Sequence, residues 1–401
     1  MNGPLESVRV LDMTSVVMGP YASQILGEYG ADVVKVEPPQ GDVMRLSGPM
    51  RNPKMGHLYM STNRAKRSVI IDLKTDEGRT LLLELAANFD VLIYNIRPQA
   101  MARLGLSYDD VAVVNPEIIY VGAYGFSQRG PYAARPAYDD LIQGMAGVPW
   151  LSMQAGANEP HYAPMILADR MVGLQTVAAT ISALFHRERT GRGQRLDIPM
   201  FEGLASVVLA EHLAGAMFDP PEGPSGYQRS LSRNRKPFRT QDGYLCTLIY
   251  TDKQWRAFFK VIGEPDKFDA DARFSSQSAR LAHIDAVYGY LADCLATGTT
   301  TDWVERLVAA DIPAAPMNSI PDILDDEHLR SIGFFRHRDH PSEGPIIEMA
   351  VPTEWSDTPP GSTRPAPRPG EQTKEVLMEA GFDKTEIDAL EARGIISWPS
   401  D

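Results

Sequence analysis

The chain has 401 residues, of which 43% are hydrophobic and 23% are charged, and its formal net charge is −13. This length exceeds what one simple hydrophobic core supports, so we expect two domains. The negative charge argues against nucleic acid and anionic membranes as general partners, because both attract positively charged surfaces.

The two cysteines, Cys246 and Cys294, are too few for a disulfide framework or a thiolate metal site. The first residues lack a basic start followed by an apolar stretch, so we expect no signal peptide. No apolar run has the length needed to span a bilayer. The sequence therefore predicts a soluble, cytoplasmic protein that does not bind a membrane.

The N-terminal half alternates predicted strands with predicted helices. Val8–Met13 is a predicted strand, Pro20–Tyr29 a helix and Asp32–Glu37 the next strand, which together form a βαβ unit. Strands that are apolar on both faces and alternate with helices predict a doubly wound, Rossmann-like α/β sheet. Further strands are predicted at 68–72, 91–94 and 118–122, with a helix at 76–87.

The first turn between strand and helix carries no nucleotide-binding motif. Residues 13–20 contain neither G-x-G-x-x-G nor a P-loop lysine, so we expect no dinucleotide cofactor. Ligands of such sheets bind at the carboxyl ends of the strands, next to helix N-termini. This rule selects the loops at 14–20, 72–75, 95–104 and 122–140.

The second half predicts a smaller α/β domain between two Pro-rich linkers, residues 219–224 and 358–370. Strands are predicted at 195–199 and 243–249, and helices from Asp169 to about Arg189 and at 201–217, 252–262, 277–296 and 301–310. The predicted domains are a large α/β domain (1–218), a small α/β domain (225–335) and a C-terminal connector and helix (340–401) that return to the large domain.

A lone aspartate, Asp169, stands where the apolar run Pro164–Ala168 meets the long predicted helix. Backbone N–H groups and the helix dipole stabilise a carboxylate at such a position, so Asp169 can be a helix cap. The alternative is a nucleophilic carboxylate of the kind used in covalent catalysis.

Five motifs stand in register along the chain: Val10–Glu37, Asn63–Ser68 with Asp72–Lys74, Asn95–Pro98 with Arg103–Gly105, Arg135–Asp139, and Thr190–Gln194. Together they resemble the family III coenzyme A transferases, over essentially the whole chain. The resemblance implies an enzyme that moves CoA from an acyl-CoA to a small free carboxylic acid, needs no metal or redox cofactor, and forms an interlocked homodimer.

The same resemblance places the family's nucleophile on Asp169, which would form a mixed anhydride and then an aspartyl-CoA thioester. Val17 and Met18 would approach the thioester and pantetheine through backbone atoms. Asp139 matches an acidic residue near the catalytic centre, although a hydrogen-bonding role in the core is the alternative. The further CoA-binding residues that the resemblance implies are Ile71, Asp72, Leu73, Lys74, Asn95, Ile96, Arg97, Arg103, Arg135 and Tyr138.

Three departures from formyl-CoA transferase argue against formyl-CoA or oxalate as the substrate. Val17 stands in place of a glutamine, Pro38 in place of an arginine, and the glycine-rich flap has no counterpart. In the flap's place, residues 225–242 form either a solvated linker or a site for the free carboxylate of the acid substrate. Their basic residues are Arg229, Arg233, Arg235, Lys236 and Arg239.

Two alternative functions remain. A 2-methylacyl-CoA racemase of the same fold needs a histidine beside a carboxylate, near Ala137 or Tyr138, but no histidine stands between His57 and His161. A catalytically silent acyl-CoA-binding protein is the second, and Asp169 argues against it. Whether His161 touches substrate, and which acids exchange CoA, stay open; small dicarboxylic, branched and aromatic acids all fit.

Overall fold

The computed structural model describes residues 3–359 and 364–399, which fall into two compact units. Unit 1 comprises Met1–Ala146, Pro164–Ser206 and Arg330–Asp401, and unit 2 comprises Gly147–Ala163 and Val207–Leu329. Unit 1 thus differs from the predicted large domain, 1–218, because residues 147–163 and 207–218 belong to unit 2. The boundary between residues 206 and 207 falls inside a helix, where composition gives no signal. The predicted connector at 358–370 includes residues 360–363, which lie outside the described residues.

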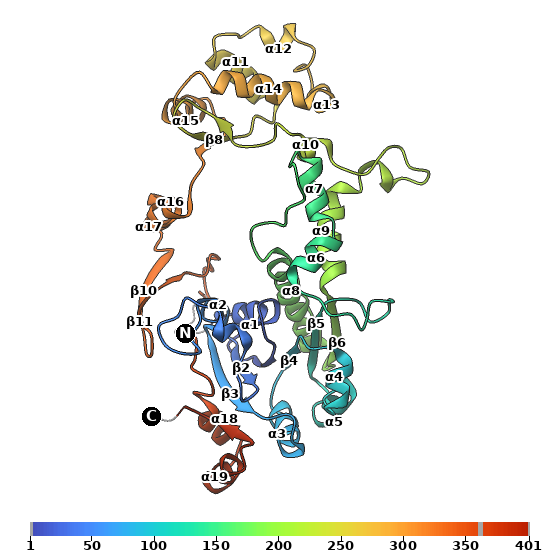
Figure 1. Cartoon of the computed structure of the whole chain (residues 1–401), viewed down its shortest axis with the longest axis vertical. Helices are drawn as coiled ribbons and strands as arrows, with labels where there is room; N and C mark the ends of the chain where they lie inside the picture. The colour runs from blue at the N-terminus through green and yellow to red at the C-terminus, as the bar shows by residue number, and fades with distance from the viewer. Residues whose placement is uncertain (1–2, 360–363, 400–401) are drawn as a thin grey trace. The chain divides into compact units, whose positions relative to one another are not determined.

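Unit 1 is built on a seven-stranded sheet in the order β12-β3-β2-β1-β4-β5-β6 (Figure 1). All neighbours are parallel except β12, which pairs antiparallel with β3. Without β12 this is the 3-2-1-4-5-6 order of doubly wound folds, so the predicted α/β class is confirmed. The strands are β1 (Arg9–Met13), β2 (Asp32–Glu37), β3 (Lys66–Ile71), β4 (Val91–Tyr94), β5 (Ile119–Tyr124), β6 (Gln194–Pro199) and β12 (Ile396–Ser397).

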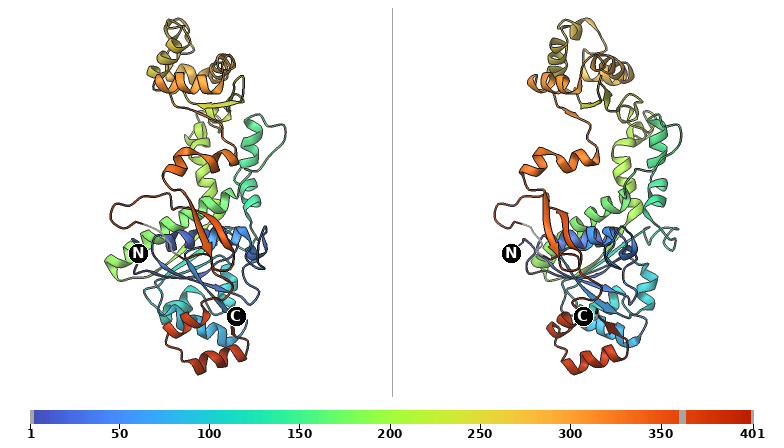
Figure 2. Two further views of the ribbon diagram at one scale, coloured as in Figure 1. Left: turned by 90° about the vertical axis from the view of Figure 1, so that its left-hand side faces the viewer. Right: turned by 60° about the vertical axis from the view of Figure 1, so that its left-hand side comes forward.

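Helices cover both faces of this sheet (Figures 1 and 2). One face carries α1 (Met18–Glu28), α2 (His57–Asn63) and α8 (Leu167–Thr190). The other face packs a continuous apolar core against the strands. It carries α3 (Asp76–Ala86), α4 (Pro98–Arg103), α5 (Tyr108–Val114), α18 (Thr373–Glu379) and α19 (Lys384–Ala392).

Helix α1 begins at Met18, two residues before the predicted start at Pro20. Proline fits the first turn of a helix because its missing N–H has no partner there in any case, so Pro20 does not mark the boundary. Unit 1 also contains η1 (Val43–Leu46), α6 (Asp139–Met145), and a hairpin of β10 (Phe335–His340) and β11 (Gly344–Met349).

Unit 2 has a core of its own, in which Trp255, Phe258, Phe259, Phe274 and Trp303 are buried together. Its antiparallel sheet has the order β7-β8-β9, with bounds Phe238–Arg239, Tyr244–Thr247 and Ala314–Pro316. Its helices are α7 (Val148–Gln154), η2 (Ala214–Met217), α10 (Gln228–Leu231), α11 (Asp252–Val261), α12 (Lys267–Ala270), α13 (Gln277–Ala282), α14 (Ile284–Leu295), α15 (Thr300–Ala309) and α16 (Ile320–Asp325).

Helix α9 (Met200–His212) and helix α17 (Glu327–Ser331) each run from one unit into the other. The predicted helix at 201–217 is interrupted after His212, because Ala214 adopts a positive φ of 45° and the chain continues as η2. Among the described residues, no helix combines the length and apolar character that crossing a membrane requires.

Candidate active site

Asp169 is the third residue of α8 and is buried, with 7% of its surface exposed. The N-cap position belongs to Ile166, whose side chain cannot accept a hydrogen bond from the helix. Asp169 is therefore not the cap of this helix. Its place in the first turn still puts its carboxylate close to the positive end of the helix dipole.

A second carboxylate, that of Asp139, serves as the acceptor at the start of α8. Asp139 is the first residue of α6, and its Oδ1 accepts the backbone N–H of Asp169 at 3.0 Å. Its Oδ2 accepts Nε2 of Gln143 at 2.6 Å, and the same amide group donates to the carbonyl oxygen of Met165 at 3.2 Å. Because Gln143 is fully buried, it holds the Asp139 carboxylate in one orientation.

This environment changes the acidity of Asp169. Burial, and after it the negative charge of Asp139, raise the pKa of Asp169 to about 7, against the opposing charge of Arg170. The Arg170 guanidinium lies over the ring of Tyr21 on α1, 4.3 Å from its centroid. A carboxylate with a pKa of about 7 is a stronger base than an ordinary aspartate, and such shifts concentrate at functional sites.

Helix α8 approaches the start of α1 closely, one turn after Asp169. A Cβ atom on Gly173 would lie 3.1 Å from the carbonyl oxygen of Met18 and 3.0 Å from Cδ1 of Tyr21. These contacts are tighter than ordinary van der Waals contact, so the absence of a side chain at Gly173 favours the close approach. The structure therefore brings the helix of the predicted nucleophile against the helix that begins with the predicted thioester-binding residues, Val17 as its N-cap and Met18 as its first residue.

The turn between β1 and α1 has a strained backbone. Val16 has a φ of 71°, which is unusual for a β-branched residue and costs on the order of 1–3 kcal/mol. Asn95, which follows β4, binds both backbone groups of Ser15, the residue before Val16. Its Oδ1 accepts the N–H of Ser15 at 3.0 Å, and its Nδ2 donates to the Ser15 carbonyl oxygen at 2.6 Å. Asn95, predicted to bind CoA directly, is thus placed to fix the turn.

A cavity of about 500 Å³ lies at the carboxyl ends of β1 to β4. Here the sheet order reverses between β1 and β4, the position where doubly wound sheets bind ligands. The wall includes five residues that the sequence predicted to bind CoA: Ile71, Asp72, Leu73, Lys74 and Ile96. The same wall contains Thr14 and Ser15, which belong to the predicted ligand loop 14–20. It also contains the loop 38–43, in which the sequence analysis had named only Pro38, as a departure.

The predicted arginines are outside this wall. Arg97 donates from Nη1 to the carbonyl oxygen of Ala134 at 3.1 Å, and the Arg135 guanidinium lies 3.9 Å from the ring centroid of Tyr132. Arg103 is exposed in the last turn of α4, next to Leu104 of the wall. Tyr138 is the N-cap of α6, and 68% of its surface is exposed.

His161 and the basic segment 225–242 belong to unit 2. His161 is exposed, and its backbone N–H donates to Oγ of Ser152 at 3.1 Å. Arg233, Arg235, Lys236 and Arg239 are exposed, and Arg229 is partly buried with its guanidinium 5.9 Å from the ring centroid of Tyr250.

Two residues of this site escaped the sequence analysis, Gln143 and Asp42. Gln143 follows Asp139 at the i+4 spacing at which side chains meet on a helix, and this spacing was an available signal. Asp42 follows Gly41 in the loop after β2, where the sequence predicts a turn and gives no sign of a functional residue. In the ranges 3–359 and 364–399, no group of three or more His, Cys, Asp or Glu residues is placed to hold a metal ion.

A family model described as CoA-transferase family III matches residues 5–373. The succinate–glutarate CoA-transferase of Agrobacterium fabrum is 32% identical, over 94% of this chain and 95% of its own. The beta subunit of the Chloroflexus aurantiacus succinyl-CoA–L-malate CoA-transferase is 32% identical, over 98% of each chain. The formyl-CoA:oxalate CoA-transferase of Streptomyces coelicolor is 32% identical, over 98% of this chain and 99% of its own.

Solved structures give the same result for the fold. A CAIB/BAIF family protein from Brucella suis superposes with a TM-score of 0.78 at 29% identity, covering 95% of this chain and 100% of that one. Rv3272 from Mycobacterium tuberculosis superposes with a TM-score of 0.80 at 29% identity, covering 93% and 99%.

Proposed function

The chain belongs to the family III CoA-transferases, and from this premise we propose that it transfers CoA through a covalent intermediate on Asp169. The observation that carries the proposal is the arrangement of two carboxylates at the start of α8. Asp139 already accepts the N–H of Asp169. Asp169 is therefore not needed as a cap, and yet it is buried next to a like charge that raises its pKa to about 7. A buried carboxylate with a raised pKa that caps no helix is a candidate for a catalytic role.

In the proposed reaction, the Asp169 carboxylate attacks the thioester carbonyl of the donor, and CoA leaves as a thiolate. The products are a mixed anhydride on Asp169 and free CoA thiolate. The thiolate then attacks the Asp169 carbonyl, releases the first acid as a carboxylate and leaves CoA bound to Asp169 as a thioester. Covalent catalysis of this kind divides one difficult exchange into easier steps.

The second half repeats these steps in reverse order with a new acid. Its carboxylate attacks the aspartyl-CoA thioester, which gives a second anhydride and expels the thiolate. The thiolate attacks the acyl carbonyl of that anhydride, forms the new acyl-CoA and frees the Asp169 carboxylate. The first-turn position of Asp169 supports negative charge that develops beside the α8 N-terminus in each tetrahedral intermediate. No metal or redox cofactor is required for any step.

The cavity at the carboxyl ends of β1 to β4 is the proposed site for CoA itself. Its wall combines apolar side chains with Lys74, which suits a pantetheine chain and a phosphate. Arg97 and Arg103 remain proposed phosphate partners, since a guanidinium matches phosphate geometry. The proposed roles of Asn95, Arg135, Tyr138 and Asp139 are to shape this site and position Asp169.

Small dicarboxylic acids are the proposed substrates. Succinate, glutarate, malate and oxalate occur in the names of the relatives. Val17 in place of the glutamine of formyl-CoA transferase still argues against formyl-CoA and oxalate for this chain. Succinyl-CoA is therefore the first donor to test, with glutarate and malate as acceptors.

The proposed assembly is an interlocked homodimer, which rests on the family resemblance and on the two Pro-rich connectors. A connector that cannot fold into a helix or strand suits a chain that threads its partner. Light scattering coupled to size exclusion would give the mass of a dimer.

The test of the function is trapping of the intermediate. Protein incubated with succinyl-CoA and quenched with hydroxylamine should carry a hydroxamate on the peptide that contains Asp169, detected by mass spectrometry. A racemase would instead exchange the α-proton of a 2-methylacyl-CoA with deuterium from the solvent. A silent binding protein would show neither reaction. Absence of the hydroxamate, in protein that binds CoA, would remove Asp169 from the nucleophile's role.

A further inference from the structure

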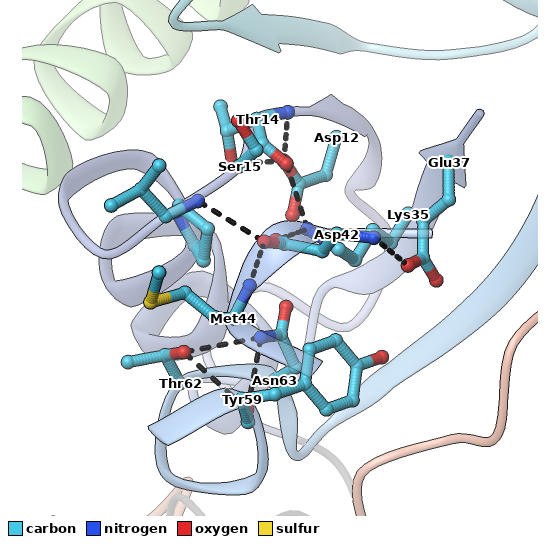
Figure 3. Close-up of polar contacts among 12 residues, drawn as sticks. Asp12, Thr14, Ser15, Lys35, Glu37, Asp42, Met44, Tyr59, Thr62 and Asn63 are labelled. Atoms are coloured by element: carbon cyan, nitrogen blue, oxygen red, sulfur yellow. Dashed lines mark hydrogen bonds and ion pairs between the residues drawn. The ribbon is translucent and has the colours of Figure 1, made fainter. Parts of the chain in front are cut away.

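Two buried charges from the β2 segment contact the turn between β1 and α1 (Figure 3). Lys35 lies in β2 and Asp42 in the loop after it, and their side chains have 0% and 1% of their surface exposed. Lys35 Nζ is 2.9 Å from Oδ2 of Asp42 and donates to the carbonyl oxygen of Thr14 at 2.7 Å. Oδ1 of Asp42 accepts the N–H of Val16 at 3.3 Å. The pair thus holds the turn at two points.

The remaining polar groups of the turn are also bound by side chains. Asp12 accepts the N–H of Thr14 at 2.8 Å, and Asn95 binds both backbone groups of Ser15. Five consecutive backbone groups, from the Thr14 N–H to the Val16 N–H, therefore end on side chains rather than on other backbone groups. The conformation of the turn depends on these side chains, because the positive φ of Val16 is unfavourable by itself.

Both carboxylate oxygens of Asp42 are in use. Oδ1 serves the N–H groups of Val16 and of Met44, the latter at 2.9 Å, while Oδ2 faces the Lys35 ammonium. An asparagine has only one acceptor oxygen. In one orientation its NH₂ group would face the Lys35 ammonium, and in the other it would face the N–H groups of Val16 and Met44. A nearly isosteric change at position 42 therefore releases one of the two points at which the turn is held.

We propose that Lys35 and Asp42 are a positioning pair for CoA transfer. They hold the β1–α1 turn in the conformation in which Thr14 and Ser15 are part of the cavity wall and Val17 is the N-cap of α1. This inference rests on the proposed function, which places the acyl-CoA in that cavity with its thioester beside the turn. The pair acts on the thioester through the turn and takes no part in bond making.

The test compares Asp42→Asn with Asp32→Asn. Asp32 is the first residue of β2, at the end away from the loop that carries Asp42, and it pairs with Arg67 at 2.5 Å. The control therefore removes a carboxylate charge at the other end of the strand from the turn. Hydrogen exchange of the peptide covering residues 13–18 is followed by mass spectrometry without ligand. Loss of the hold should accelerate this exchange by about tenfold or more in Asp42→Asn and leave it unchanged in Asp32→Asn.

Kinetics supply the second measurement. Asp42→Asn should lower kcat about tenfold or more with succinyl-CoA, while its KM for succinyl-CoA changes little, because a misplaced thioester slows attack without removing the contacts of the nucleotide. A merely structural role would lower the unfolding temperature of Asp42→Asn and leave kcat of the folded protein unchanged, and this result would overturn the proposal.

Lys35→Met is the second variant, since methionine keeps most of the length of the side chain and removes the charge. It should accelerate exchange of the same peptide and lower kcat in the same way. If hydrogen exchange of the peptide 13–18 is unaltered in both variants, the pair does not hold the turn, whatever the activity. If wild-type protein forms no aspartyl-CoA but both variants show faster hydrogen exchange of this peptide, the proposed function is wrong, while the role of the pair in holding the turn is supported.

Discussion

Asp139 accepts the backbone N–H of Asp169 at 3.0 Å, so one carboxylate stabilises the start of the helix that carries the other. The same negative charge makes ionisation of Asp169 harder. Asp139 therefore favours the helix and disfavours the charged form of its neighbour. This opposition predicts how stability and activity change when either carboxylate is replaced.

Asp169→Asn should abolish CoA exchange and raise the stability of the protein. The amide removes the nucleophile, and it also removes a buried charge that ionises only with difficulty. Initial rates with succinyl-CoA and the midpoint of thermal unfolding at pH 8 measure the two effects. Retention of more than a trace of exchange in the purified variant would show that the nucleophile is another group.

The stability gain of Asp169→Asn should depend on pH. The pKa of Asp169 is about 7 in the folded protein against 3.8 for ordinary aspartate, so the folded state binds the extra proton between these values. The contribution of Asp169 to wild-type stability therefore falls as pH rises from about 4 to 7, by an amount on the order of 4 kcal/mol. Urea midpoints of both proteins at pH 5 and pH 8 test this.

The difference between the urea midpoints should be larger at pH 8. Asp140→Asn, on the exposed side of α6, serves as the control and should give the same difference from wild type at both values. Equal differences for Asp169→Asn at pH 5 and pH 8 would contradict a raised pKa.

Asp139→Asn should shift the pH dependence of the exchange rate. In wild-type protein the rate should rise with pH through about 7, as Asp169 loses its proton. Without the charge of Asp139, the pKa of Asp169 falls and the rise moves to lower pH. Hydroxamate formation in single-turnover experiments between pH 5 and pH 9 reports this step. A profile that does not move would mean that Asp139 acts only as the helix acceptor.

Lys74→Met and Arg103→Met should each weaken CoA binding by about 1–3 kcal/mol, the scale of a charge-assisted contact. Lys74 is in the cavity wall, and Arg103 is exposed next to Leu104 of that wall. Calorimetric titration with CoA gives the affinities, with Lys260→Met of unit 2 as a matched control. Wild-type affinity in both variants would place the nucleotide elsewhere.

Arg235→Gln with Lys236→Gln should raise KM for the acid substrate and spare KM for acyl-CoA. Both side chains are exposed, so an effect of about fivefold is expected, since an exposed ion pair contributes up to about 1 kcal/mol. Lys260→Gln should change neither constant. Equal changes in both constants, or none, would return the segment 225–242 to a solvated linker.

The strands of the large sheet could be predicted well because they are short apolar runs with clear ends. β2 and β4 have the predicted bounds, Asp32–Glu37 and Val91–Tyr94. The short helices α6 and α7 were missed, since seven residues hold too few turns to show helical periodicity. β12 was missed because a strand of two residues carries no pattern.

The site was predictable in its parts but not in its contacts. Asp169 and Asp139 both carried a signal through the family resemblance, but their contact spans thirty residues of chain, and no local pattern shows which carboxylate accepts the N–H. The Lys35–Asp42 pair carried no signal. A lysine inside an apolar strand ordinarily indicates a strand at the edge of a sheet. The buried partner of Lys35 is known only from the structure of the loop after the strand.

The antiparallel strand β12 has a consequence for how the protein is made. Ile396 pairs with Ile71, and the carbonyl oxygen of Ile395 accepts the N–H of Asp72 at 2.8 Å. Ile71 and Asp72 lie in the cavity wall, and their partners thus leave the ribosome more than three hundred residues after them. Until they emerge, this edge of β3 has no partner, so an unpaired strand edge is exposed beside the forming ligand cavity during translation.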